Sequence, residues 1–197
     1  NIWSNASILI IGKLGVILFF VLSGFLITYL LLMEEKNTNT ISIRHFYIRR
    51  LLRIWPLYYL ITILSLFVFP YIPFLELTNT LFTDEYSLIK IFLFIGFLPN
   101  LALILFSPVP YLSQSWSVGV EEQFYIFWPL TLWIAGKLKQ NLLFLCFFFM
   151  MSSFFINIFW VQRFPTEIYF WPFGRFWELL VGSILAWAML YKANIFL

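Results

Sequence analysis

The stretch SQSWSVGVEEQFYIFWP, residues 113–129, places two adjacent carboxylates at the head of an apolar, aromatic segment. A charged side chain at the centre of a membrane helix costs about 2.5–3.5 kcal/mol on insertion scales, so an ionisable residue at that depth indicates a functional site. If a helix begins near Ser117, then Ser117, Glu121 and Tyr125 recur every four residues on one polar face. Glu122 points about 100° away from Glu121, so the two carboxylates are expected to have different roles.

The composition of the chain is that of an integral membrane protein. Of its 197 residues, 62% are hydrophobic and only 11% are charged, whereas soluble domains average about 25% charged residues. The mean hydropathy is +0.93. The single cysteine, Cys146, lies in an apolar run, which excludes a disulfide within the chain and indicates a small buried hydrophobic residue.

Apolar runs of about twenty residues, the length that crosses a bilayer, predict an all-α, polytopic transmembrane helix bundle. We expect six spans, at residues 12–32, 54–72, 88–106, 117–135, 142–161 and 173–190. The polar residues 34–42 are expected to form a loop. Alternation of six spans places Lys137 and Lys139 outside, against the positive-inside bias, so either a re-entrant segment precedes the fourth span or the bias is weak there.

Charge is distributed unevenly along the chain. Residues 34–53 carry a net charge of +3, and residues 70–90 carry −2. Since Lys and Arg in short loops set orientation, the first segment is predicted to be cytoplasmic and the second to be outside. The basic segment is short and lies between two spans, so it is not a nucleic-acid-binding arm.

The basic segment contains IRHFYIRRLLR at residues 43–53, which predicts an interfacial helix that carries Arg49, Arg50 and Arg53 within one turn. Two interpretations remain open. The guanidinium groups anchor the helix to phospholipid phosphates, or they clamp the phosphates of a cytosolic donor. His45 is interpreted as interfacial structure before catalysis.

Small residues mark the first and last spans. Ser23 and Gly24 interrupt the first span, which indicates either close helix packing or a weak point that lines a cavity. In the last span, small residues at multiples of four surround Glu178, and Arg175 precedes it by three residues. This spacing favours a structural ion pair over a catalytic role.

Four motifs together resemble the acyltransferase 3 family, integral membrane acyltransferases that modify sugars on bacterial envelope polysaccharides, such as lipopolysaccharide, and related acceptors. They are LGVILFFVLSGFLIT (residues 14–28), FYIRRLLRIWPLYY (46–59), SQSWSVGVEEQFYIFWP (113–129) and GRFWELLVGSILA (174–186). The resemblance implies a domain of about ten spans in the bacterial inner membrane. Residues 1–197 are therefore expected to form part of one such transmembrane domain.

The resemblance also assigns expected roles to residues. It implies an acyl-CoA donor, usually acetyl-CoA, that enters from the cytoplasm, and no tightly bound cofactor or metal. The candidate catalytic residues are Glu121, Ser117, Glu122 and Tyr125; the candidate donor-binding residues are Arg50, Arg53 and Arg49; the candidate site-lining residues are Ser23, Gly24, Ser115, Trp116, Arg175 and Glu178. The family's favoured catalytic histidine belongs to a span before residue 14 that this sequence does not contain, so the chain alone is expected to be inactive.

The leading hypothesis is an O-acyltransferase that moves an acyl group, most often acetyl, from acyl-CoA to a hydroxyl of a cell-envelope carbohydrate. A base must deprotonate the hydroxyl, and Glu121 would either orient that base or act itself. The expected partners are acyl-CoA, a carbohydrate acceptor and the lipid bilayer, with no nucleic acid. The alternatives are a transporter or channel that uses Glu121 and Glu178, or a scaffold subunit without chemistry. The acceptor, the acyl chain length and the oligomeric state stay open.

Overall fold

The computed structural model describes residues 6–72, 87–106, 108–109, 111–138 and 140–192, and this part of the chain is helical without a β-strand. The predicted all-α class is confirmed. The longer helices are α1 (Ala6–Thr38), α2 (Ile43–Ile63), α6 (Trp116–Lys137), α7 (Leu142–Val161) and α9 (Phe176–Tyr191). The short ones are η2 (Leu64–Val68), η3 (Phe69–Tyr71), α4 (Ser87–Ile95), α5 (Pro99–Leu105), η5 (Ser113–Ser115), α8 (Pro165–Phe170) and η6 (Pro172–Gly174).

Three helical segments in the described part of the chain are long and apolar enough to cross a membrane: Ile10–Thr38, Ile43–Tyr71 and Leu142–Val161. They identify the chain as a membrane protein built from helices. The last of them begins and ends at the residues that the sequence predicted. The predicted number of six spans is not confirmed, since α9 has only 16 residues and α4 and α5 are shorter still.

The chain divides into two compact units. Unit 1 comprises Asn1–Ile41, Phe124–Tyr169 and Phe173–Leu197, and unit 2 comprises Ser42–Gln123 and Phe170–Pro172. Helix α6 therefore contributes its first two turns to unit 2 and its remainder to unit 1.

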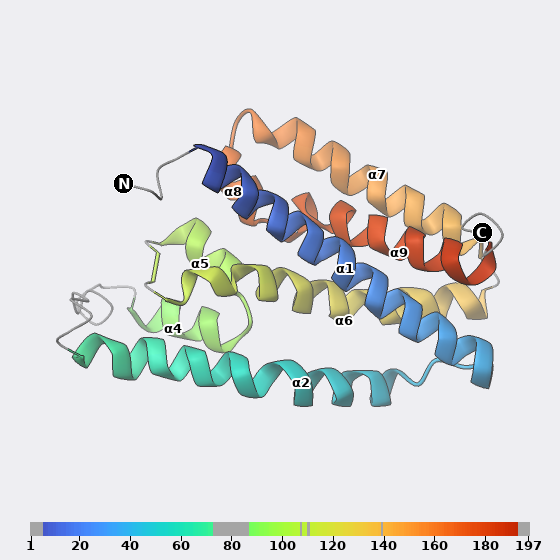
Figure 1. Cartoon of the computed structure of the whole chain (residues 1–197), viewed down its shortest axis with the longest axis horizontal. Coiled ribbons are helices and arrows are strands. Elements are labelled where there is room, and N and C mark those ends of the chain that lie inside the picture. Colours follow the sequence, from blue (N-terminus) through green and yellow to red (C-terminus); the bar gives the residue numbers. More distant parts are fainter. Residues whose placement is uncertain (1–5, 73–86, 107, 110, 139, 193–197) are drawn as a thin grey trace. The chain divides into compact units, whose positions relative to one another are not determined.

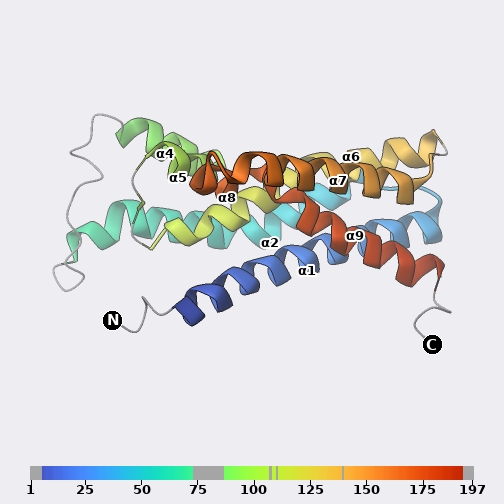
Figure 2. The same ribbon diagram turned by 90° about the horizontal axis from the view of Figure 1, so that it is seen from above.

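In unit 1, α9 lies between α1 and α7 and packs along both (Figures 1 and 2). A Cβ atom added to Gly24 would lie 1.9 Å from the carbonyl oxygen of Leu179, and one added to Gly182 would lie 1.9 Å from that of Val21. The two helix backbones thus touch at reciprocal glycines. This contact confirms the packing interpretation of the small residues, because lipid gives no hydrophobic drive and close approach must supply the contact energy.

Buried hydroxyl groups reinforce the same contact in unit 1. The Thr28 hydroxyl donates to Ser183 Oγ at 2.8 Å and accepts from Trp128 Nε1 at 2.7 Å. Thr28 and Ser183 have no exposed surface, and Trp128 is buried as well. The three side chains join α1, α9 and α6, so each polar atom finds its partner inside the bundle.

Helix α1 is longer than predicted, because it begins at Ala6 and continues through Thr38. The predicted loop at residues 34–42 is therefore wrong for its first five residues. Glu and Lys are good helix formers, so the polar residues mark where the helix leaves the apolar layer and not where it ends. The helix ends at Asn39, which adopts a left-handed conformation (φ 58°) and donates its N–H to the Glu35 carbonyl at 2.8 Å.

In unit 2, α2 is one continuous helix, so the predicted boundary between an interfacial helix and a second span near residue 53 is wrong. Pro56 lies inside the helix. It removes one backbone donor without ending the helix. Arg49, Arg50 and Arg53 consequently belong to the same continuous helix as Tyr58 and Tyr59.

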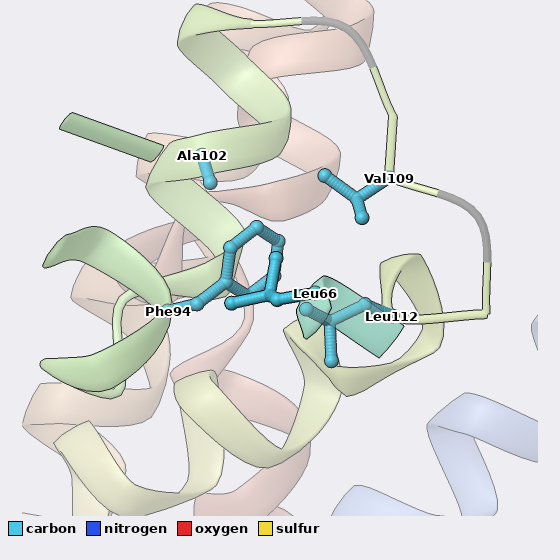
Figure 3. Close-up of a cluster of buried hydrophobic side chains, with 5 residues drawn as sticks. All are labelled: Leu66, Phe94, Ala102, Val109 and Leu112. Carbon is cyan, nitrogen blue, oxygen red and sulfur yellow. The ribbon is translucent and has the colours of Figure 1, made fainter. Parts of the chain in front are cut away.

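The predicted third span is not a single helix. Glycine and proline interrupt it, and α4 and α5 are two short helices that run back along each other. Lys90 Nζ of α4 lies 5.6 Å from the Phe106 ring centroid, just beyond α5. A buried apolar cluster holds the pair against η2 and the segment before η5 (Figure 3); it consists of Leu66, Phe94, Ala102, Val109 and Leu112. This arrangement favours the re-entrant alternative for the segment that precedes α6.

Side chains of α2 donate hydrogen bonds to carbonyl groups at the end of α4. Tyr58 donates its hydroxyl to the Phe94 carbonyl at 2.7 Å, and Tyr59 donates to that of Ile95 at 2.9 Å. Phe97, in a left-handed conformation (φ 57°), stacks on Tyr58 with a centroid distance of 4.0 Å. Non-helical backbone is tolerated in a membrane protein only where such partners replace water.

Three helix ends converge at one end of unit 1, where α1, α6 and α9 finish (Figure 1). A Cβ atom on Gly136 would lie 2.6 Å from Glu35 Oε1, and the Glu35 carboxylate interacts electrostatically with Tyr191. Alternation of six spans would have separated the lysines of these ends, whereas the structure brings them together: Lys36, Lys137 and Lys192. Lys139 lies outside the described residues.

Candidate functional site

The candidate site is centred on the first turns of α6, which begins at Trp116 as a continuation of η5. The helix is continuous, so Ser117, Glu121 and Tyr125 have the predicted four-residue spacing along one face. Glu121 is only 5% exposed, and Ser117 is half-buried, with its hydroxyl donating to the Gln114 carbonyl at 3.4 Å. The predicted polar strip thus carries a buried carboxylate.

Glu122 faces α2 within unit 2. Its carboxylate interacts electrostatically with Trp55 and with the Arg50 guanidinium, which both belong to α2. About two turns earlier, the Ser115 hydroxyl lies near that of Tyr58 on α2. Glu122 and Ser115 therefore face the same side of α2, which explains why Glu122 and Glu121 have different surroundings although they are adjacent in sequence.

The three arginines of α2 are not equivalent. Arg50 is half-buried, lies 5.8 Å from the Phe46 ring centroid and faces Glu122. Arg49 and Arg53 are exposed. The structure thus brings Arg50 to the carboxylate-bearing helix and leaves Arg53, its expected partner in donor binding, on the exposed part of α2.

A hydrogen-bonded amide pair, buried Asn100 and half-buried Gln123, lies beside the carboxylates of α6. Asn100, at the start of α5, has no exposed surface, and its Oδ1 accepts from Gln123 Nε2 at 2.9 Å. The sequence indicates that Asn100 needs a partner because it lies in an apolar run. It does not identify Gln123 as that partner, since no local spacing relates residues 23 positions apart.

The serine and the glycine of the first span have separate roles in unit 1. The hydroxyl groups of Ser23 and Tyr125 share a hydrogen bond, so Ser23 contacts one of the candidate catalytic residues. Gly24 contacts the α9 backbone through its missing side chain. The cavity-lining interpretation consequently does not hold for Gly24, which is a packing residue.

Arg175 and Glu178 form the predicted ion pair, with Nη1 2.5 Å from Oε1. Glu178 has no exposed surface and Arg175 is 8% exposed. Arg175 also donates its Nε to the Tyr169 carbonyl at 3.0 Å and stacks on the Tyr169 ring, with 4.1 Å to its centroid. These contacts close the turn between α8 and α9 and support a structural role for the pair.

Trp116 belongs to the packing of unit 2, where it meets Phe170 edge-on at a centroid distance of 5.1 Å.

The sequence analysis missed two polar residues of α7 that hold the segment before α9. Ser153 donates to the Phe173 carbonyl at 2.5 Å, and Asn157 donates to the Gly174 carbonyl at 3.0 Å. Their four-residue spacing inside an otherwise apolar helix is the signal that identifies this stripe.

Comparison with known proteins supplies the family. A model of an acyltransferase domain, acyltransferase 3, matches residues 1–191. The chain is 33% identical to a Bacillus subtilis protein provisionally named peptidoglycan O-acetyltransferase YrhL, over 95% of this chain and 30% of that protein. It is 35% identical to an uncharacterized protein of Haemophilus influenzae, over 86% of this chain and 72% of that protein.

A Staphylococcus aureus (strain COL) protein provisionally named an O-acetyltransferase is 32% identical, over 89% of this chain and 30% of that protein. The chain thus spans less than a third of the length of the Bacillus and Staphylococcus relatives. No solved structure matches. The extent of the domain match and these identities show that the chain belongs to the acyltransferase 3 family.

Proposed function

We propose that the protein is a membrane O-acyltransferase that moves an acetyl group from acetyl-CoA to a hydroxyl of a cell-envelope carbohydrate. The observation that carries the proposal is the family match over residues 1–191, within which a buried carboxylate and an arginine-bearing helix belong to one unit. The names of the Bacillus and Staphylococcus relatives support O-acetylation, and the Bacillus name supports peptidoglycan as the acceptor.

The chemistry requires a base and a donor site. A neutral sugar hydroxyl is a poor nucleophile, so a base takes its proton as the oxygen attacks the thioester carbonyl; the C–S bond then breaks and the CoA thiolate leaves. Glu121 is proposed to orient that base or to accept the proton itself. Its buried position supports this role, since a carboxylate at membrane depth is retained for function.

Arg50, with Arg49 and Arg53 on the same helix, is proposed to hold the donor's phosphates. A guanidinium binds phosphate oxygens through two parallel hydrogen bonds, which gives orientation as well as attraction. The electrostatic interaction of Arg50 with Glu122 supports this role, because it indicates that Arg50 lies on the side of α2 toward α6.

The first test replaces Glu121 by Gln in the full-length protein. Membranes that contain the protein are incubated with radiolabelled acetyl-CoA, and label in purified peptidoglycan and other envelope polysaccharides is counted. We expect a loss of about 100-fold or more, the usual contribution of a positioned acid or base. Thr131→Val is the matched control on α6, because its hydroxyl bonds only the Phe127 carbonyl of its own helix among the described residues.

Two results would contradict this proposal. Wild-type transfer by the Glu121→Gln variant would remove Glu121 from the site. Absence of label with intact wild-type protein would reject acetyl transfer from acetyl-CoA and would favour the transporter alternative.

The second test replaces Arg50 and Arg53 by Lys, which keeps the charge and removes the bidentate geometry. We expect the KM for acetyl-CoA to rise by about 10-fold, because one well-oriented charged contact is lost. Arg44→Lys, at the exposed start of α2, is the control. An unchanged KM would mean that the arginines anchor the helix to lipid phosphates.

A further inference from the structure

The amide pair of Asn100 and Gln123 fixes α6 within unit 2. Gln123 Nε2 donates to Asn100 Oδ1 at 2.9 Å and also approaches the Phe97 carbonyl at 3.4 Å. Asn100 Nδ2 donates in turn to the Phe170 carbonyl at 3.3 Å. The pair therefore ties α6 to both sides of the break between α4 and α5.

One turn earlier on the same face of α6, Gly119 packs closely against the start of α5. A Cβ atom on Gly119 would lie 2.7 Å from Pro99 Cδ and 3.3 Å from Asn100 Oδ1. Gly119 and Gln123 are four residues apart, so they stand one above the other on a helix. Together they hold α6 in one rotation and one height against the start of α5.

That rotation decides where the neighbouring carboxylate points. Glu122 precedes Gln123 by one residue and is therefore turned about 100° from it, toward Trp55 and Arg50 of α2. A small rotation of α6 about its axis would move the Glu122 carboxylate away from both groups. An apolar pair at positions 100 and 123 would fill the space without fixing the angle, since packing alone specifies orientation less strongly than directed hydrogen bonds.

We propose that Asn100 and Gln123 are positioning residues of the donor site: they fix the rotation of α6 at which Glu122 is turned toward α2, whose Arg50 binds the phosphates of acyl-CoA. The inference rests on the proposed function and adds to it the residues that set donor affinity from a distance. Neither amide touches the donor. Each acts through Glu122.

The test measures acetyl transfer by the full-length protein in membranes as a function of acetyl-CoA concentration. The variants are Asn100→Leu and Gln123→Leu, each alone and combined with Glu122→Gln. We expect either amide variant to raise the KM for acetyl-CoA by about 10-fold with kcat changed less than about 2-fold. In the Glu122→Gln background the same substitution is expected to leave KM unchanged, because the group through which it acts is gone.

If Asn100 and Gln123 only stabilise the fold, the kinetic constants are expected to change in a different way. Loss of folded protein lowers the apparent kcat at constant KM, and by the same factor in both backgrounds, so this result would overturn the proposal. The exchange Asn100→Gln with Gln123→Asn keeps one amide on each helix and is expected to recover part of the wild-type KM. Thr131→Val serves again as the control on α6.

A geometric readout separates this inference from the proposed function. In a Cys146→Ser background, Arg50→Cys and Glu122→Cys are joined by a short bis-maleimide. We expect Gln123→Leu to reduce the cross-linked fraction several-fold. If wild-type protein transfers no acetyl group but this reduction occurs, the proposed function fails while the positioning of α6 by the amide pair stands. An unchanged cross-linked fraction overturns the positioning.

Discussion

Glu178 is a carboxylate without exposed surface whose Oε1 is held by Arg175 at 2.5 Å. Removing one partner of such a pair leaves a buried charge without compensation, whereas replacing both by apolar groups is often tolerated. The pair could be predicted because its members are three residues apart on one helix. The amide pair and the contact between Thr28 and Ser183 could not be predicted, since 23 and 155 residues separate their members.

We predict that Arg175→Met destabilises the protein by about 3–5 kcal/mol, because the buried carboxyl group of Glu178 loses its partner. Combining it with Glu178→Leu is expected to recover most of the loss. The measurement is thermal unfolding of the full-length protein in detergent, followed by intrinsic fluorescence. A double variant no more stable than Arg175→Met would show that the charge of Glu178 is not the source of the destabilisation.

Among the helices, α6, α7 and α9 lie close to the predicted ranges, because each combines an apolar run with a clear boundary. Asn141 provides one such boundary, since its side chain accepts hydrogen bonds from the first N–H groups of α7. Polar residues do not always end a helix: residues 34–38 are polar and predict a loop, but they belong to α1. The interruption between α4 and α5 depends on partners supplied by Tyr58 and Tyr59, which no local pattern reveals.

The contact between α1 and α9 gives a prediction with internal controls. Gly24→Ala and Gly182→Ala each place a methyl group against a backbone carbonyl that cannot move aside, so we expect a loss of about 1–3 kcal/mol or more. Gly12→Ala and Gly15→Ala meet nothing within 4 Å and are expected to be neutral or to stabilise by up to about 1 kcal/mol.

Thermal unfolding of the four variants checks this prediction. Equal changes in stability for all four Gly→Ala variants would contradict it. They would show that the loss of backbone flexibility at glycine, and not the close approach of α1 to α9, determines the stability of the variants.

The lysines at one end of unit 1 indicate how this unit is oriented in the membrane. The ends that carry Lys36, Lys137 and Lys192 converge, and an excess of lysine and arginine characterises the cytoplasmic side. We predict that this end of unit 1 faces the cytoplasm. The alternation of six spans would place these ends on opposite sides, because it counts α4 and α5 as one crossing.

Cysteine accessibility checks the orientation. In a Cys146→Ser background, Lys36→Cys and Lys137→Cys are each expected to react with a membrane-impermeant maleimide only after the cells are permeabilised. Arg163→Cys, at the other end of α7, is expected to react in intact cells. Labelling of Lys36→Cys and Lys137→Cys from opposite sides would contradict the convergence of these helix ends.

The reciprocal glycine contact also bears on how the protein is made. Helix α1 is translated before its partner α9, and about 155 residues separate the two contacting segments. At about 5–20 residues per second this interval lasts roughly 8–30 s. During that time the α1 face that bears Gly24 and Thr28 is exposed to lipid or to the insertion machinery. Biogenesis must therefore keep this face open while the intervening helices are made, among them α2, α4, α6 and α7 in the described part of the chain, and the arrival of α9 completes unit 1.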